Sequence, residues 1–309
     1  MLSYGEIQTM SFGKQTNLLT IILIILIPVA GATGFLITWG VMRGGGASTE
    51  INVEGSTTVW KIMETSHQEF MAAHPSVTVT VSATGSGSGI TALIDGQCDV
   101  AMASRPFKPE ENTAAGGELT DFAIAKDGLA IIINSAADPL DVTIEEARQI
   151  FNGEITSWSD PEVSDAGLTG DIQVVVRESG SGTRDTFNDI VMGDEDQVEP
   201  GSQYVSGALE KTSNQLIKDA VAENENYIGY VGLGYVSGDV EAVSIGGVAP
   251  SKATVVDDSY PVARSLFLIT IGEPEGMVKE FINFHFSPTC QYIVEDVGFI
   301  AVGTKWDEL

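Results

Sequence analysis

The stretch IQVVVRESGSGT, residues 172–183, carries an apolar run directly into a turn of glycine and hydroxyl residues. The run 172–176 predicts a buried strand, and the spacing of Phe187 and Val191 predicts a helix after the turn. Arg177 stands at the end of the strand, with hydroxyls and open backbone amides after it. A guanidinium and the free N–H groups of a helix start both favour an anion. The stretch therefore predicts one strand–turn–helix unit of an α/β fold, with an anion at its turn.

Two further stretches repeat this order of strand, small-residue turn and helix. One runs from residues 51–53 into 54–58, and the other runs from 77–81 into 85–89. Small residues let a ligand approach the backbone closely. Taken alone, 85–89 could be a flexible loop and 54–58 an ordinary helix cap. Together, the three turns predict several helix N-termini that converge on one oxyanion.

The charge balance restricts the kind of partner. The chain has 43 acidic and 15 basic residues, a formal net charge of -28. Such a surface repels polyanions, so we expect no nucleic-acid partner. It also repels a phosphate-like ion at long range. An anion site must therefore be a local pocket built from arginine and backbone dipoles.

Few residues are available for metal or disulfide chemistry. The histidines, His67, His74 and His285, have no metal-ligand spacing, so we expect neither a metal nor a cofactor. Cys98 and Cys290 are too few for a disulfide framework. They could pair in an oxidising compartment or remain as two buried free thiols.

The N-terminal segment predicts a membrane helix. Residues 15–42 contain no charged side chain, and Lys14 and Arg43 stand at the two ends. This length suffices to span a bilayer and exceeds the apolar region of most cleaved signal peptides. We expect residues 1–47 to hold a membrane anchor or signal segment and a glycine-rich tether, and we favour an anchor that is not cleaved. The remaining chain would then lie outside the cytoplasm.

The rest of the chain alternates predicted strands and helices, the pattern of an α/β fold. Thr143 and Glu146 form a capping box at the start of one predicted helix, and Gly153 can end that helix.

Eight stretches of the chain form a recognisable set: EGSTTV (54–59), GSGSG (85–89), ASR (103–105), IFNGEITSW (150–158), RESGSGT (177–183), IGYVG (228–232), YPVAR (260–264) and the closing segment 281–303. Taken together, these motifs resemble the phosphate-binding substrate-capture proteins of ABC-type phosphate importers, in the archaeal and bacterial branch of the periplasmic binding protein family. The resemblance covers residues 51–303.

The resemblance implies a two-lobed α/β fold of the type II periplasmic-binding-protein class, preceded here by the N-terminal transmembrane helix. Lobe one would comprise 48–130 plus 260–309, and lobe two would comprise 131–259. Two hinge crossings would lie near 128–130 and 262–266. Ligand contacts from both lobes would then favour the closed form.

By position, the resemblance also implies a set of phosphate-binding residues. The set comprises Ser56, Thr57, Thr58, Ser88, Ser104, Arg105, Arg177, Ser181, Gly182 and Thr183. Well-known periplasmic members carry an aspartate at the position of Arg105, which accepts the proton of hydrogen phosphate. They carry another at the position of Ser179, which holds the site arginine. This chain lacks both, and its more positive pocket could also suit sulfate, molybdate or tungstate.

The expected function is extracytoplasmic binding of inorganic phosphate and its delivery to the permease subunits of an ABC transporter, without chemical reaction. A first alternative is a binding protein for another tetrahedral oxyanion. A second is a surface phosphatase with Ser181 or Thr183 as nucleophile, although neither hydroxyl has a histidine or lysine near it in sequence to act as base. A third is a structural or adhesion domain, which would not need three polar glycine turns.

Overall fold

The computed structural model describes residues 49–193 and 204–303. The chain divides into Met1–Gly44 and Gly45–Leu309, and all described residues belong to the second unit. The predicted transmembrane helix within 1–47 lies outside the described residues. Among the helices that the structure does describe, none has the length and apolar character needed to cross a membrane.

The described chain is an α/β fold, as predicted. Its strands are β1 (Thr49–Gly55), β2 (Val77–Ala83), β3 (Val100–Ala103), β4 (Leu119–Asn134), β5 (Asp141–Val142), β6 (Gln173–Arg177), β7 (Leu209–Lys211), β8 (Tyr227–Gly232), β9 (Val240–Ala242), β10 (Ser244–Ile245), β11 (Ala263–Ile271) and β12 (Ile300–Ala301). Its helices are α1 (Trp60–Ala73), α2 (Ser86–Ile94), α3 (Pro109–Ala114), α4 (Ile144–Asn152), α5 (Gly182–Phe187), α6 (Asn214–Glu223), α7 (Lys252–Val256), α8 (Gly276–Phe284) and α9 (Pro288–Asp296), with shorter turns η1 (Ser164–Ala166), η2 (Asn188–Met192) and η4 (Leu233–Tyr235).

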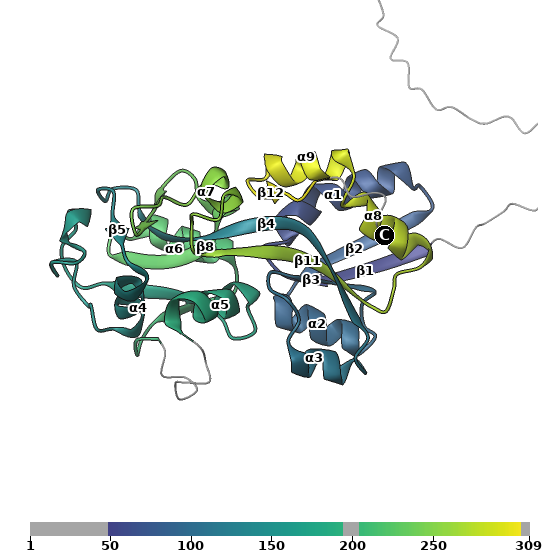
Figure 1. Ribbon diagram of the computed structural model, residues 1–309, viewed down its shortest axis with the longest axis horizontal. Coiled ribbons are helices and arrows are strands. Elements are labelled where there is room, and N and C mark those ends of the chain that lie inside the picture. The colour runs from purple at the N-terminus through teal and green to yellow at the C-terminus, as the bar shows by residue number, and fades with distance from the viewer. Residues whose placement is uncertain (1–48, 194–203, 304–309) are drawn as a thin grey trace, which may run out of the picture. The chain divides into compact units, whose positions relative to one another are not determined.

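One sheet runs through the described residues in the order β2-β1-β3-β11-β4-β8-β6-β7. The long strand β4 changes partner along its length, because residues 119–128 pair antiparallel with β11 and residues 129–133 pair antiparallel with β8. Figure 1 shows β4 and β11 running between two groups of elements. We call the group β1–β3, α1–α3, α8 and α9 the first half. The group β5–β10 with α4–α7 is the second half.

Helix α4 begins and ends at the residues that the sequence predicts. Thr143 accepts a hydrogen bond from the Glu146 backbone, and the Glu146 side chain accepts one from the Thr143 backbone. Gly153 ends α4 with a φ of 85°, a conformation that glycine adopts without a Cβ penalty. The predicted capping box and its terminating glycine are therefore confirmed.

Aromatic packing in the core of the second half supports the 177–183 turn. The ring of Phe187, on α5, stacks on Tyr230 of β8 with centroids 4.0 Å apart. Both side chains are fully buried. The Tyr230 hydroxyl accepts a hydrogen bond from the Arg177 backbone N–H at 3.2 Å. The packed Tyr230 side chain thus fixes the position of the Arg177 backbone at the end of β6.

Both cysteines are buried free thiols in the structure, so of the two interpretations the paired one is wrong here. Burial raises the pKa of Cys98 and of Cys290 to about 12, which leaves both uncharged at neutral pH.

Candidate functional site

Buried hydroxyl groups meet at the junction of the two halves. Thr58 Oγ1, in the turn between β1 and α1, lies 3.2 Å from Thr183 Oγ1 on α5. Ser86 Oγ, at the start of α2, lies 3.2 Å from Ser104 Oγ and accepts the Ser104 N–H at 3.1 Å. All four side chains are buried. We call Thr58, Ser86, Ser104 and Thr183 the hydroxyl cluster.

Close backbone approach at Gly182 joins the third turn to this cluster. A Cβ at Gly182 would lie 2.4 Å from Ser86 Oγ and 2.7 Å from Ser104 Oγ, so only glycine fits there. Nearby, the N–H of Gly87 donates to the carbonyl of Gly180 at 3.0 Å. The structure therefore brings the three predicted turns together, two from the first half and one from the second.

The guanidinium of Arg264 lies against the hydroxyl cluster. Its Nη1 donates to Thr183 Oγ1 at 3.0 Å, and its Nη2 donates to Thr58 Oγ1 at 3.3 Å. Nη1 also donates to the carbonyl of Ser104 at 3.4 Å. Arg264 therefore contacts residues from both halves, although it lies in none of the three turns that the sequence singles out.

Asp127 holds the opposite edge of this guanidinium. Its Oδ2 accepts from Nε of Arg264 at 3.1 Å and from Nη2 at 2.8 Å, while Oδ1 accepts the N–H of Leu233 at 3.0 Å. Complete burial raises the pKa of the Asp127 carboxyl, and the charge of Arg264 opposes that shift. Burial lowers the pKa of Arg264, which Asp127 opposes and the nearby charge of Arg177 reinforces.

Asn214, at the start of α6, completes the junction from the second half. Its Nδ2 donates to Thr58 Oγ1 at 2.8 Å and lies 3.5 Å from Thr57 Oγ1. Its Oδ1 accepts the N–H of Gly232 at 3.2 Å. Asn214 is fully buried, and its amide orients the Thr58 hydroxyl toward the junction.

Arg177 is buried but already paired. Its Nε and Nη2 donate to the two carboxylate oxygens of Glu178 at 2.9 and 2.8 Å, and Nη2 also donates to the carbonyl of Thr212 at 3.4 Å. The neighbouring Glu178 thus holds the arginine. That is the role which the resemblance gave to an aspartate at the position of Ser179.

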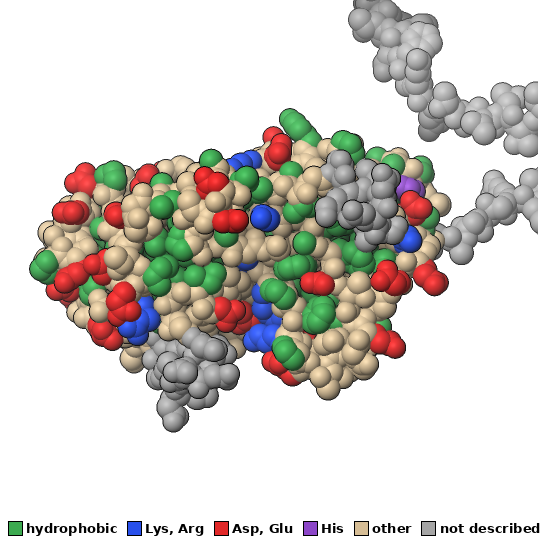
Figure 2. Space-filling model, in the orientation of Figure 1, with side chains coloured by type: hydrophobic (Ala, Val, Ile, Leu, Met, Phe, Trp, Pro, Cys, Tyr) green, Lys and Arg blue, Asp and Glu red, His purple; other side chains and the backbone are tan. Residues whose placement is uncertain are grey.

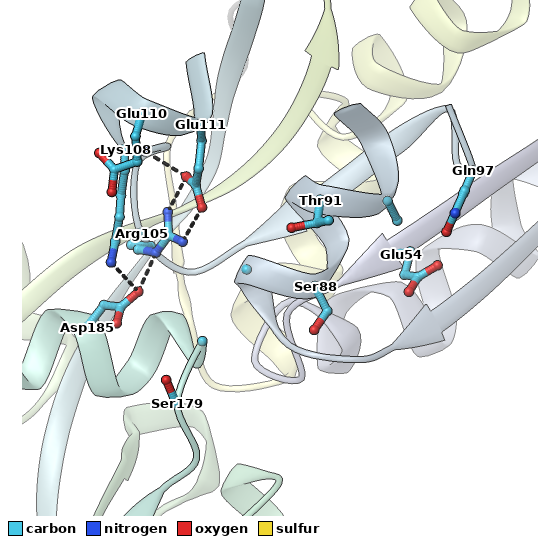
Figure 3. Close-up of a pocket in the computed structure, with 13 residues that line it drawn as sticks. Glu54, Ser88, Thr91, Gln97, Arg105, Lys108, Glu110, Glu111, Ser179 and Asp185 are labelled. Carbon is cyan, nitrogen blue, oxygen red and sulfur yellow. Dashed lines mark hydrogen bonds and ion pairs between the residues drawn. The ribbon is translucent and has the colours of Figure 1, made fainter. Parts of the chain in front are cut away.

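Arg105 lies at the junction but donates to acceptors outside the hydroxyl cluster. Its Nε donates to Asp185 on α5 at 2.6 Å, and its two terminal nitrogens donate to Glu111 on α3 at 2.8 and 2.7 Å (Figure 3). Lys108 Nζ lies 3.5 Å from the same Asp185 oxygen. Burial alone would lower the pKa of Arg105, but the two carboxylates raise it above its usual value. Arg105 therefore links the first half to the second by ion pairs.

These ion pairs line an open cavity of about 670 Å³ beside the cluster. Ser88 lines the same cavity from α2, and Ser179 lines it from the second half (Figure 3). On the face shown in Figure 2, Lys and Arg side chains gather at the junction, while acidic side chains are spread over both halves. The lining of the cavity nevertheless holds four carboxylates, Glu54, Glu110, Glu111 and Asp185, against Arg105 and Lys108, so the outer cavity is not the local positive pocket that the sequence predicts.

The ten predicted ligand residues therefore occupy different environments. Thr58, Ser104, Gly182 and Thr183 meet at the junction, with Thr57 at its edge. Ser181 Oγ accepts the backbone N–H of Arg184 and so caps α5, while Ser56 Oγ accepts the backbone N–H groups of Thr58 and Val59 in the turn before α1. Ser88 and Arg105 line the outer cavity, and Arg177 is paired with Glu178.

Four residues of the junction are absent from the predicted set: Ser86, Asp127, Asn214 and Arg264. Ser86 belongs to the same turn as Ser88, and Arg264 is the last residue of the YPVAR motif, so the sequence motifs could have indicated both residues. Asp127 and Asn214 lie in no motif that the sequence analysis identified. Across 49–193 and 204–303, no group of three His, Cys, Asp or Glu side chains is arranged to hold a metal ion.

Comparisons with known proteins agree with this architecture. Residues 42–289 match the PBP superfamily domain. The phosphate-binding protein PstS of Bacillus subtilis is 31% identical over 258 residues, which cover 83% of this chain and 82% of that protein. A putative phosphate ABC transporter substrate-binding protein from Clostridium perfringens, solved with bound phosphate, is similar with a TM-score of 0.73 and 32% identity, covering 82% of this chain and all of that one.

A second solved structure, an ABC-type phosphate transport receptor from Vibrio cholerae, has a TM-score of 0.66 and 30% identity over 82% of this chain and all of that one. The resemblance found in the sequence is thereby confirmed. The chain belongs to the PBP superfamily and, within it, to the PstS family of phosphate-binding proteins.

Proposed function

We propose that this chain binds inorganic phosphate outside the cytoplasm and delivers it to the permease subunits of an ABC transporter. The observation that carries the proposal is the hydroxyl cluster, which is buried and drawn from both halves of the fold. A tetrahedral oxyanion presents oxygens in four directions, so it needs donors on several sides. Family membership, with a phosphate-bound relative among the similar structures, supports phosphate as the ion.

We assign the ligand contacts to the hydroxyl cluster and to the backbone at Gly182, with Thr57 and Ser181 next to them. Arg177 forms an ion pair with Glu178, so the two side chains together add no net charge beside the cluster. Ser88 and Arg105 were predicted as ligands. Their position in the outer cavity favours a role at the entrance to the site instead.

The two halves act as lobes in this proposal, with lobe one at 48–130 plus 260–309 and lobe two at 131–259. The change of β4 partner after Gly128 supports a crossing there, and the start of β11 at Ala263 supports the second. Anion contacts from both lobes give the closed form a higher affinity than the open form, which is what ligand-driven closure requires.

The N-terminal segment anchors the protein to the membrane in this proposal, and the charge-free run 15–42 is its support. The binding domain would then lie at the outer face of the cell membrane, where released phosphate can enter a permease directly.

The alternatives receive less support. The chain carries out no reaction in this proposal, because the Thr183 hydroxyl contacts Thr58 and Arg264 and the Ser181 hydroxyl accepts the Arg184 N–H. None of these groups is a general base for a nucleophile at neutral pH. Sulfate, molybdate or tungstate remains the second candidate ligand.

Calorimetric titration of the full chain in detergent with phosphate, sulfate, molybdate and tungstate tests the proposal. We expect saturable heat with phosphate and much weaker binding of the other three. A preference for one of the others would replace phosphate by that ion. Release of product from a chromogenic phosphate ester, abolished by Thr183→Ala, would instead indicate an enzyme.

A further inference from the structure

We infer that Arg264 is a guanidinium that binds the anion, and that Asp127 is the residue that positions it. This inference rests on the proposed phosphate binding and adds two residues that the motif-based ligand set omits. It concerns how the site recognises charge, because the hydroxyl cluster by itself carries none.

The hydrogen-bond partners of the three buried arginines separate their roles. A guanidinium binds an oxyanion through a pair of parallel N–H groups on one edge. In Arg105, Nε and both terminal nitrogens donate to carboxylates. Arg177 and Arg264 are each held by a carboxylate through the Nε–Nη2 edge, Arg177 by Glu178 and Arg264 by Asp127. The other described contact of the Arg177 guanidinium is with the Thr212 carbonyl, whereas the second edge of Arg264 faces the hydroxyl cluster.

The contacts of that second edge are all with neutral oxygens. Nη1 donates to Thr183 Oγ1 and to the carbonyl of Ser104, and Nη2 reaches Thr58 Oγ1. A hydrogen bond from a cation to an anionic oxygen is about twice as strong as a neutral one. Thr58 Oγ1 and Thr183 Oγ1 are 3.2 Å apart, so a phosphate ion enters only when the two halves separate. It then takes over these donors, and the hydroxyls turn to bond it as well.

Asp127 fixes the direction in which this edge points. Asp127 and Arg264 are directly paired across β4 and β11, at the place where β4 leaves β11 for β8. The Leu233 N–H holds the second carboxylate oxygen, so the carboxylate cannot rotate freely. A Cβ at Gly232 would lie 2.7 Å from Asp127 Oδ2 and 3.3 Å from Thr58 Cγ2, which shows how closely the carboxylate approaches the cluster.

The location of the pair has a mechanical consequence. The hydroxyls belong to one half or the other, and they separate if the halves move apart. Arg264 and Asp127 belong to the two strands that run between the halves. The guanidinium therefore keeps its place during such a movement and can hold the anion before closure brings the second set of donors.

Titration of the full chain with inorganic phosphate tests the role of Arg264. We compare wild type with Arg264→Gln and with Arg148→Gln, whose arginine is on the surface of α4 and pairs with Glu145. We expect Arg264→Gln to raise the Kd at least about thirty-fold, because a desolvated charge loses its partner. The control should stay within about twofold of wild type. A wild-type protein that does not bind phosphate would overturn the proposed function. Wild-type binding with an Arg264→Gln Kd within threefold would overturn only the role of Arg264.

A second variant separates a loss of phosphate binding from a loss of folding. Arg264→Gln alone leaves Asp127 as an unpaired buried charge, which can destabilise the fold. The double variant Asp127→Asn/Arg264→Gln removes both charges at nearly constant volume. We expect it to melt close to wild type and still to bind phosphate at least about thirty-fold more weakly. A folded double variant that binds phosphate within threefold of wild type would also overturn the role of Arg264.

Adding the single variant Asp127→Asn to wild type, Arg264→Gln and the double variant completes a double-mutant cycle for Asp127. If Asp127 acts by positioning Arg264, Asp127→Asn should raise the Kd about tenfold when Arg264 is present and less than twofold when it is glutamine. A purely structural role would raise the Kd by the same factor in both backgrounds, and that result would overturn the positioning role.

Discussion

The ion pairs of Arg105 predict that Asp185→Asn weakens phosphate binding without touching the hydroxyl cluster. Arg105 and Asp185 come from opposite halves, and their nitrogen and oxygen atoms lie 2.6 Å apart. If the halves separate in the unbound protein, this bond breaks. It therefore stabilises the closed arrangement specifically, and its loss should shift the equilibrium toward the open one.

The burial of the pair sets the size of the effect. The side chains of Arg105 and Asp185 are 6% and 13% exposed, between the limits of a surface pair and a fully buried one. Surface pairs contribute about 0–1 kcal/mol, and breaking a buried pair costs about 3–5 kcal/mol. Since Glu111 still compensates Arg105 in the variant, we expect about 1–2 kcal/mol. The apparent Kd for phosphate should then rise about 5- to 30-fold.

The assay is calorimetric titration with phosphate at low and high salt, with Glu145→Gln as the control for an exposed pair. Arg105→Gln should raise the Kd by a similar factor, and the double variant with Asp185→Asn should be no worse than the worse single variant. Added salt should reduce the difference from wild type only in part, because the pair is mostly buried. An Asp185→Asn Kd within twofold of wild type would refute the closing role. If Arg105→Gln is far more damaging and adds to Asp185→Asn, then Arg105 contacts the ion itself, as the sequence resemblance implied.

Three further predictions concern stability and processing. Gly55→Ala should lower the free energy of unfolding by about 2 kcal/mol or more in urea titrations, because Gly55 has a φ of +138° and its Cβ would lie 2.2 Å from the Met102 carbonyl oxygen; Gly96→Ala, which has open space, should cost less. Burial lowers the pKa of His285 from 6.5 to about 4. When the pH falls, the imidazole of the unfolded chain therefore takes up a proton at a higher pH than the imidazole of the folded protein. The contribution of His285 to the free energy of unfolding is complete above pH 6.5 and falls by about 3 kcal/mol as the pH drops to 4. Unfolding curves of His285→Gln taken across this range should lack this pH dependence. Mass spectrometry of native protein should find peptides from residues 1–14, and a mature N-terminus at or beyond residue 44 would show that the anchor is cleaved.

The turns could be predicted from the sequence because their signals are local. Glycine and hydroxyl residues after an apolar run report a strand end and a helix start within a few residues. The close approach of Gly182 to two serines shows why glycine is needed there. That the three turns meet followed from the rule that ligand sites of α/β folds lie beyond the carboxyl ends of strands.

Which hydroxyl of a turn faces the site could not be predicted, because this depends on where the helix begins. Helix α2 starts at Ser86 itself. At about 100° per residue, Ser86 and Ser88 point about 200° apart. One serine therefore reaches Ser104, and the other lines the outer cavity. If the helix began two residues later, Ser88 would take the place of Ser86, and nothing in GSGSG distinguishes these cases.

The arginines show a second limit, set by partners that are distant in sequence. With 43 acidic residues against 15 basic ones, an arginine near the junction readily meets a carboxylate. Arg177 meets its neighbour Glu178, but Arg105 meets Asp185, which is 80 residues away, and Arg264 meets Asp127, which is 137 residues away. The number of positive charges at the site therefore says little about how it binds an anion. What decides is whether the edge that the carboxylate leaves uncovered reaches the hydroxyl cluster, and the pairing of β4 with β11 places that edge of Arg264 against Thr58 and Thr183.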